Sequence, residues 1–285
     1  MKRVSLLLFV QIFAISVFSD EYKDLVTNVI YTYNPSDNKA EVKRGEDWEY
    51  LDNGETLPGR PGSPDAKGEI VILDNFTING KEYIVDRIGE CAFLYLNITS
   101  VIIPSSVKSI GYHAFADCKS LSNVSLSEGL DSIRTLAFQN CISLKGIFLP
   151  EGLRVIQWGA FSGSNLTSII IPSSVKVIGT GAFSSQSINT ITSLIENPFV
   201  VQDICSPPLQ NQITLRVPCG TKVKYEATAG WNQFGTIEEL LPTGINSSLL
   251  DKVDKDPLCK DLQGRRITGK PAKGLYIQNG KKYVK

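Results

Sequence analysis

The chain has 285 residues, with 29 Lys and Arg against 29 Asp and Glu, and one histidine. The balanced charge gives no electrostatic basis for binding nucleic acid, and a single histidine excludes metal centres built from several histidines. The length fits one elongated domain followed by a small tail.

The first segment has the pattern of a secretory signal peptide. Lys2 and Arg3 precede an apolar run from residue 6 to residue 18, and Val17 and Ser19 fit the small-residue rule for cleavage before Asp20. A buried N-terminal helix is the alternative interpretation. No later apolar run is long enough for a transmembrane helix, and no cysteine follows the run to carry a lipid anchor.

The next segment, up to residue 84, contains short β patterns. Residues 29–33 alternate as a strand does, and residues 40–42 would return as its hairpin partner. Residues 69–73 and 81–85 flank Asn79-Gly80, which is a strong hairpin turn signal. We interpret this segment as a cap, because a stack of short strands would otherwise expose an apolar face and an unpaired edge.

A repeat follows from about residue 85 to residue 198. An Ala-Phe pair recurs five times, and the phenylalanines are 22, 23, 23 and 22 residues apart. A period in the twenties indicates a solenoid. An isoleucine stands five residues before each phenylalanine. The two columns are Phe93, Phe115, Phe138, Phe161 and Phe183, and Ile88, Ile110, Ile133, Ile156 and Ile178.

Two further columns lie two residues apart, which is the period of a strand with both side chains on one face. Stacked about 4.8 Å apart, such strands complete one another's backbone hydrogen bonds and bury one continuous core. Ser193 interrupts the second column in the fifth repeat. The columns are Val101, Val124, Ile147, Ile169 and Ile191, and Ile103, Leu126, Leu149 and Ile171.

Beyond residue 198 the repeat decays. Residues 213–217 predict one more strand, and residues 221–229 predict a short helix with Thr221 as its cap and Gly230 as its stop. Trp231 and Phe234 would then lie over the end of the core.

The tail from about residue 243 is a separate unit. Residues 251–285 carry ten Lys and Arg against four Asp, a net charge of +6, so the body of the chain is mildly acidic. Residues 261–267 and 273–282 suggest short strands around turns, with Asn279-Gly280 as a hairpin signal. An ordinary solvated basic edge is the alternative.

The repeat resembles a known family. The pattern I-G-x-x-A-F-x-x-C-x-x-L-x-x-V-x-L-x-x-G at residues 110–129 is similar to the BspA-like leucine-rich repeats of bacterial surface proteins. Residues 217–220 with Tyr225 and Trp231 resemble the segment that closes such arrays. The tail resembles the small C-terminal β modules of secreted Bacteroidetes proteins, some of which are sorting or attachment signals.

Together these patterns predict a β-rich α/β solenoid, which the resemblance makes a right-handed leucine-rich repeat superhelix of about five 22–23-residue repeats, with an N-terminal β cap and a C-terminal cap. The expected units are a signal peptide (1–19), an N-terminal cap with β hairpins (20–84), the repeats (85–198), a C-terminal cap (199–242) and a small basic β-rich tail (243–285).

Residues suited to catalysis are scarce, and we expect no catalytic, cofactor or metal site. His113 is the only candidate base, and its equivalents in the next repeats are Leu136, Gly159 and Gly181, which favours a solvated turn residue. Cys118 and Cys141 share a repeat position, where a buried apolar role is favoured over a disulfide. A bridge between Cys205 and Cys219 is an open alternative in an exported protein.

The remaining candidate is a surface. Between the two inward columns, one side chain of each strand must face outward, and three of these five are large and apolar. They are Ile102, Ser125, Phe148, Ile170 and Thr192. Phe148 is the expected anchor, unless a loop or the N-terminal cap covers the row.

The signal-peptide pattern predicts an exported protein, secreted or attached to the cell surface or outer membrane, and the surface predicts that it binds a protein or glycan without catalysis. The resemblance adds adhesion to host matrix or to other bacteria as the context. The alternatives are an exported carbohydrate-processing enzyme or its accessory subunit, which needs a carboxylate pair about 5 to 9 Å apart, and a structural spacer. The sequence leaves the oligomeric state open.

Overall fold

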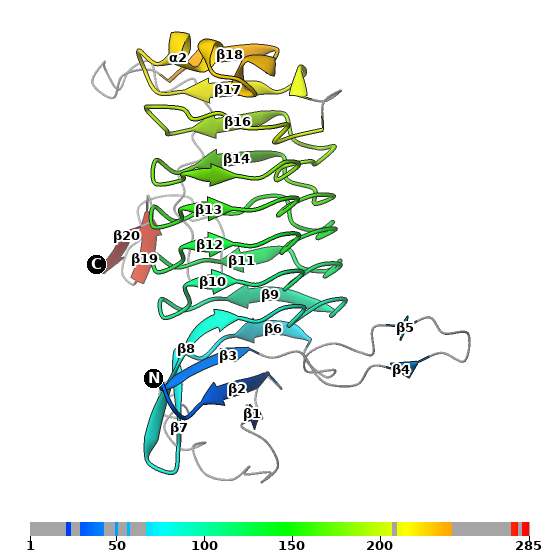
Figure 1. Ribbon diagram of the computed structural model, residues 1–285, viewed down its shortest axis with the longest axis vertical. Helices are drawn as coiled ribbons and strands as arrows, with labels where there is room; N and C mark the ends of the chain where they lie inside the picture. The colour runs from blue at the N-terminus through cyan, green and yellow to red at the C-terminus, as the bar shows by residue number, and fades with distance from the viewer. Residues whose placement is uncertain are drawn as a thin grey trace.

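The computed structural model describes residues 21–23, 29–42, 49–50, 56–57, 67–206, 210–240, 275–278 and 281–284. The chain winds into a coil whose short strands stack along one axis, with the N-terminal elements at one end and α2 and β18 at the other (Figure 1). The expected signal peptide and most of the basic tail lie outside the described residues.

One wall of the coil is a parallel ladder in which each turn supplies one short strand. The isoleucines of the first column lie directly beside one another, because Ile88 pairs with Ile110, and the pairing continues through Ile133 and Ile156 to Ile178. All five side chains are buried. The strands are β8 (Lys81–Ile88), β10 (Ser109–Ile110), β12 (Ser132–Ile133), β13 (Val155–Ile156) and β15 (Val177–Ile178).

The second wall also consists of parallel strands, but it is divided into two sheets. Val101 pairs with Val124 in the first sheet, and Ile169 pairs with Ile191 in the second, as the column pattern predicts. The first sheet contains β6 (Gly68–Val71), β9 (Ile98–Ile102) and β11 (Asn123–Ser125); the second contains β14 (Ser168–Ile171), β16 (Thr190–Ser193), β17 (Thr214–Val217) and β18 (Thr236–Glu239). The two columns also predict a strand through Ile147 and Leu149, and this prediction was wrong, since residues 146–149 form no strand and join neither sheet.

The interior between the walls holds a stack of phenylalanine rings. Consecutive ring centroids are 5.0, 5.1, 5.3 and 5.9 Å apart, and no two neighbouring planes differ by more than 10°. Every ring of the column is at most 1% exposed. The recurring Ala-Phe pair therefore supplies the core, and the small alanine beside each ring is buried with it.

The turn that carries each Ala-Phe pair contains left-handed residues at fixed positions. The residue two before each phenylalanine has φ between 52° and 66°, although three of the five residues are not glycine: Cys91, His113, Leu136, Gly159 and Gly181. The residue two after the phenylalanine has positive φ in the first four turns: Tyr95, Asp117, Asn140 and Gly163. Backbone hydrogen bonds join neighbouring turns, as from the Phe115 N–H to the Ala137 carbonyl at 2.8 Å.

The N-terminal end of the core is closed by a hairpin. β2 (Ile30–Asn34) and β3 (Lys39–Val42) are antiparallel as predicted, and β1 (Glu21–Lys23) adds to β2. β3 then runs parallel to β8, so that Val42 lies beside Ile88 and continues the isoleucine column. Two further short strands, β4 (Glu49–Tyr50) and β5 (Thr56–Leu57), pair with each other.

The hairpin at Asn79-Gly80 has a different partner from the expected one. β8 pairs with β7 (Asn75–Ile78) rather than with the segment around residues 69–73, most of which forms β6 and pairs with β9. The second wall therefore starts one turn earlier than the Ala-Phe pattern indicates. The unit boundaries themselves stay a prediction.

The C-terminal end is closed by α2 (Lys222–Ala227), the 3₁₀ turn η1 (Trp231–Gln233) and β18. Thr221 is the residue before α2, but its hydroxyl donates to the Pro218 carbonyl rather than capping the helix. Trp231 is fully buried and donates its indole N–H to the Phe199 carbonyl at 2.8 Å. In the tail, β19 (Leu275–Gln278) and β20 (Lys281–Val284) pair in an antiparallel arrangement. The predicted turn at Asn279-Gly280 lies outside the described residues.

Candidate binding face

The five residues predicted to face outward lie on the second wall. Ile102 pairs with Ser125, and Ile170 pairs with Thr192, so these side chains form rows along the axis of the coil. Phe148 and Ile170 are each 42% exposed, Ser125 is exposed, and Ile102 and Thr192 are half-buried. We call this row, with its extensions below, the strand strip.

The strand strip extends at both ends beyond the five residues. Val71 pairs with Ile102 and is 45% exposed. At the other end Arg216 pairs with both Thr192 and Glu238, and its guanidinium Nε lies 3.6 Å from a Glu238 carboxylate oxygen. Val71, Arg216 and Glu238 each follow a buried or half-buried apolar residue in the sequence: Ile70, Leu215 and Ile237. This alternation was the signal for them, and it falls outside the Ala-Phe repeat. The strip from Val71 to Ile170 is therefore apolar except at Ser125, and its C-terminal end is polar.

Phe148 lies at the break between the two sheets of this wall. Residues 146–149 belong to no strand, and a Cβ added to Gly146 would meet nothing within 4 Å. Val124 and Ile147 are only half-buried, whereas the equivalent Val101 and Ile169 are buried. The exposed ring thus projects from the turn where the wall is least regular.

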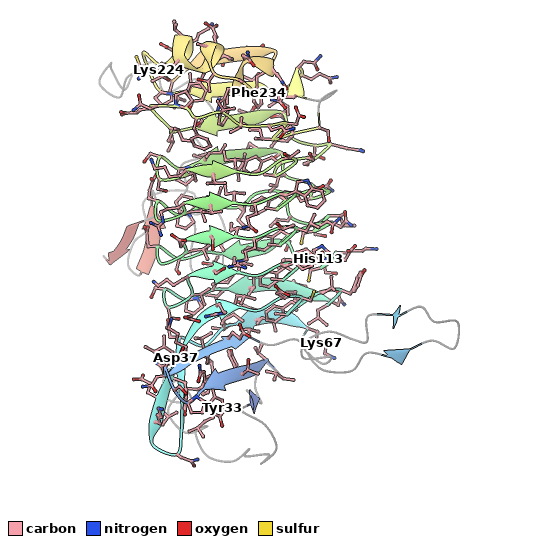
Figure 2. All side chains as sticks on the ribbon, viewed as in Figure 1. Tyr33, Asp37, Lys67, His113, Lys224 and Phe234 are labelled. Carbon is pink, nitrogen blue, oxygen red and sulfur yellow. The ribbon has the colours of Figure 1, made fainter. Side chains whose placement is uncertain are left out.

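His113 lies on the turn that follows β10, where its φ is 52°. Its ring stacks on Tyr112, with the centroids 4.0 Å apart and the planes 12° apart. Its Nε2 atom is buried without a hydrogen-bond partner among the described residues. Burial lowers the pKa of His113, and the nearby carboxylate of Asp117 partly offsets this effect. Figure 2 labels the residue near the side of the coil.

The buried cysteines of the repeat are free thiols that hydrogen-bond to the backbone. The Cys118 thiol donates to the Phe93 carbonyl at 2.8 Å, and the Cys141 thiol donates to the Phe115 carbonyl at 3.1 Å. Burial raises the pKa of Cys118 to about 12 and raises that of Cys141 well above its usual value. Cys205 is buried and Cys219 is exposed, and both are free.

Three other features bear on function: metal-ligand clusters, surface hollows and membrane-spanning helices. Within the described ranges, no group of three or more His, Cys, Asp or Glu side chains is placed to hold a metal ion. A shallow hollow of about 360 Å³ lies at the C-terminal end, lined by Lys222, Glu226 and Phe234 among others. The helices in the described part of the chain include none long and apolar enough to cross a membrane.

Comparison with known proteins agrees with the observed coil. Residues 73–200 match the family model of the BspA type leucine rich repeat region in six copies, one more than the five counted from the Ala-Phe pairs. No curated protein sequence matches the chain.

Several solved structures are similar to the chain. A leucine rich repeat protein of T. pallidum is 26% identical, with a TM-score of 0.53, over 69% of this chain and 85% of that one. A leucine-rich repeat protein from Bacteroides ovatus ATCC 8483 is 22% identical, with a TM-score of 0.49, over 70% of this chain and 56% of that one. A leucine-rich repeat protein from Bacteroides capillosus ATCC 29799 is 29% identical, with a TM-score of 0.40, over 61% of this chain and 99% of that one.

Proposed function

Because residues 73–200 are leucine-rich repeats of the BspA type, we propose that the chain is an exported adhesion protein that binds a protein or glycan ligand through the strand strip. The binding involves no chemical transformation of the ligand. Host matrix or the surface of another bacterium is the expected source of that ligand.

The observation that carries this proposal is the set of exposed apolar side chains along one wall of the coil. Val71, Phe148 and Ile170 are each more than 40% exposed, with the half-buried Ile102 and the polar Ser125 on the turns between Val71 and Phe148. Large apolar side chains gathered on one exposed face favour an interaction surface. Buried aromatic anchors usually contribute a large share of the affinity of such a surface.

A coil whose turns share one core also favours affinity for a physical reason. The backbone beneath Ile102 and Ile170 is fixed by ladder hydrogen bonds to the neighbouring strands. A partner therefore does not have to order these strands when it binds, and the entropic cost of association is smaller.

Phe148→Asp tests the proposal most directly. The variant places a charge at the expected anchor, so capture of matrix proteins or bacterial glycans by the immobilised chain should be lost while the circular dichroism spectrum stays unchanged. Val177→Asp is the matched control, because Val177 is a similarly exposed aliphatic residue (48%) on the other wall. Equal capture by the wild type and Phe148→Asp would refute the proposed face.

Export is the second part of the proposal, and it depends on residues 1–19, which lie outside the described residues. If the signal peptide is cleaved as expected, the mature chain starts at Asp20. N-terminal sequencing of the protein recovered from a native host, together with its distribution between medium and envelope fractions, checks this directly. A chain that keeps Met1 in the cytosolic fraction would contradict export.

A further inference from the structure

A second surface lies at the corner that follows each strand of the first wall. The residues three before the core phenylalanines form a column there: Glu90, Tyr112, Thr135, Trp158 and Thr180. From Tyr112 onward, the carbonyl of each accepts a hydrogen bond from the preceding turn. The Cys91 N–H donates to the Tyr112 carbonyl at 2.8 Å, and the Leu136 N–H donates to the Trp158 carbonyl at 3.0 Å. Thr135 lies between Tyr112 and Trp158 in this column, and its carbonyl accepts a hydrogen bond from the His113 N–H.

The two aromatic residues of this column are exposed. Trp158 is 53% exposed and Tyr112 is 40% exposed, whereas the phenylalanines of the core column are at most 1% exposed. They lie two turns apart, which is about 10 Å along the axis at the usual strand spacing. The Tyr112 ring is supported on one side by the stacked His113 ring.

Polar residues precede the column on the intervening turn and on the turn of Trp158. Arg134, on the intervening turn, is exposed and makes no ion pair among the described residues. The equivalent position of the preceding turn is Gly111, so no side chain crowds the guanidinium from that side. The side-chain amide oxygen (Oε1) of Gln157 accepts hydrogen bonds from the Thr135 backbone N–H at 3.1 Å and from the Thr135 hydroxyl at 3.2 Å. These bonds fix the side-chain amide of Gln157, the residue that precedes Trp158.

We propose that Tyr112, Arg134 and Trp158 form a binding site for an acidic polysaccharide whose sugars carry carboxylates. The apolar faces of two pyranose rings pack on Tyr112 and Trp158, and a carboxylate between them binds the Arg134 guanidinium, which is suited to paired hydrogen bonds with carboxylates. The Gln157 amide N–H₂ donates to a sugar hydroxyl. This site lies on a different wall from the strand strip and does not depend on it.

Two observations favour a polysaccharide over an acidic peptide. Protein hot spots are well-packed pockets that partner side chains fill, whereas these rings stand on an exposed corner of the coil. A polysaccharide also repeats along its length, so two of its rings can contact Tyr112 and Trp158, which occupy the same position two turns apart. The unpaired charge of Arg134 selects an anionic chain over a neutral one.

The test uses the full mature chain and calorimetric titration with three carboxylate-bearing probes: oligosaccharides of hyaluronan, polygalacturonate and alginate. Chitohexaose is the neutral probe and a glutamate decapeptide is the acidic peptide. We expect at least one carboxylated probe to bind, and Trp158→Ala and Tyr112→Ala each to weaken it about tenfold or more, the loss typical of a hot-spot truncation. Arg134→Gln should remove the preference over chitohexaose and the dependence on salt.

Tyr95→Ala is the matched control, because Tyr95 is a 55% exposed aromatic residue outside the column, and it should leave binding unchanged. Circular dichroism confirms that each variant is folded. Failure of all three carboxylated probes would overturn the proposal, as would binding that survives both aromatic substitutions. Equal or tighter binding of the glutamate peptide, lost in Arg134→Gln, would replace the polysaccharide site with an acidic-peptide site.

Discussion

The rings of Phe138 and Phe161, which are 23 residues apart in the chain, lie with their centroids 5.3 Å apart and their planes within 1° of parallel. The separation is set by the rise of one turn of the coil, because each ring is carried at the same position of successive turns. Each internal ring of the column is covered by the ring before it and the ring after it. The hydrophobic core is thus a continuous stack along the axis of the coil rather than a compact cluster at one place.

Removal of one internal ring should be costly. Phe138→Ala leaves a cavity between Phe115 and Phe161, and we expect a loss of about 3–5 kcal/mol in the free energy of unfolding, as for buried aromatic residues generally. Urea denaturation followed by circular dichroism measures it. Phe138→Leu fills more of the space and should cost less. A loss under about 1 kcal/mol for the alanine variant would contradict an interior column of rings.

The core was predictable because each buried position is filled by the same residue type in successive repeats. Each of the five Ala-Phe turns must bury an isoleucine and a phenylalanine at the same positions, so Ile110 and Phe115 have identical counterparts in the other four. The turn geometry was less visible. The left-handed position is occupied by His113, Leu136 and Gly159 in successive turns, so a shared backbone conformation is hidden by unrelated side chains.

The glycines that follow three of the core isoleucines allow neighbouring turns to pack closely. Gly89, Gly111 and Gly179 do not have positive φ. A Cβ on Gly89 would nevertheless lie 2.4 Å from the Val42 carbonyl oxygen, and one on Gly179 would lie 2.4 Å from the Trp158 nitrogen. Close approach to the preceding turn favours glycine there. This contact comes from the stacking and could not be read from a single repeat.

Substitutions at the left-handed glycines should separate backbone strain from crowding. Gly181 has φ of 66° and space for a Cβ, whose nearest neighbour would be the Ser184 hydroxyl at 3.4 Å, so Gly181→Ala should cost about 1 kcal/mol from strain alone. Gly159→Ala should cost more, because its Cβ would lie 2.6 Å from a Leu136 methyl. Thermal and urea unfolding of both variants provide the comparison. Equal costs would show that the Leu136 side chain moves away freely.

The candidate site was only partly predictable. The alternation of side chains predicted that Ile102 and Ile170 face outward, because a strand has a period of two; in the structure Ile170 is 42% exposed and Ile102 is half-buried. It also predicted a strand at Phe148, where G-I-F-L has the right pattern but the turn does not join the ladder. Val71 and Arg216 were missed, because their strands lie outside the repeat and join the wall only through stacking.

The titration of His113 should make stability depend on pH. Burial lowers its pKa in the folded chain below the ordinary value of 6.5, so the unfolded chain binds more protons between those two pKa values. Stability should therefore rise with pH through this window and fall as the pH drops below 6.5. His113→Asn, which tolerates the left-handed backbone, should show a smaller fall in Tm between pH 7.5 and pH 5. Parallel falls in both proteins would exclude a contribution from His113.

The thiols should differ sharply in reactivity. The thiolate is the nucleophile, and burial raises the pKa of Cys118 to about 12, so this residue should resist iodoacetamide at pH 8. Cys219 is exposed and should be alkylated under the same conditions. Peptide mapping by mass spectrometry before and after unfolding in guanidinium distinguishes them. Alkylation of Cys118 in the folded protein at the rate of Cys219 would contradict its burial.

Ser193 interrupts the inner aliphatic column because the C-terminal cap needs a polar partner there. Its hydroxyl lies 2.6 Å from the Tyr225 hydroxyl, which donates to the Ile195 carbonyl at 2.7 Å, and both side chains are completely buried. Tyr225→Phe leaves the serine hydroxyl and that carbonyl without this partner, so it should destabilise the chain by about 1–3 kcal/mol. Ser193→Ala combined with Tyr225→Phe removes the stranded hydroxyl and should cost less than the sum of the single variants. A double-mutant cycle by urea denaturation measures this coupling, and strict additivity would show that the two hydroxyls do not act as a pair.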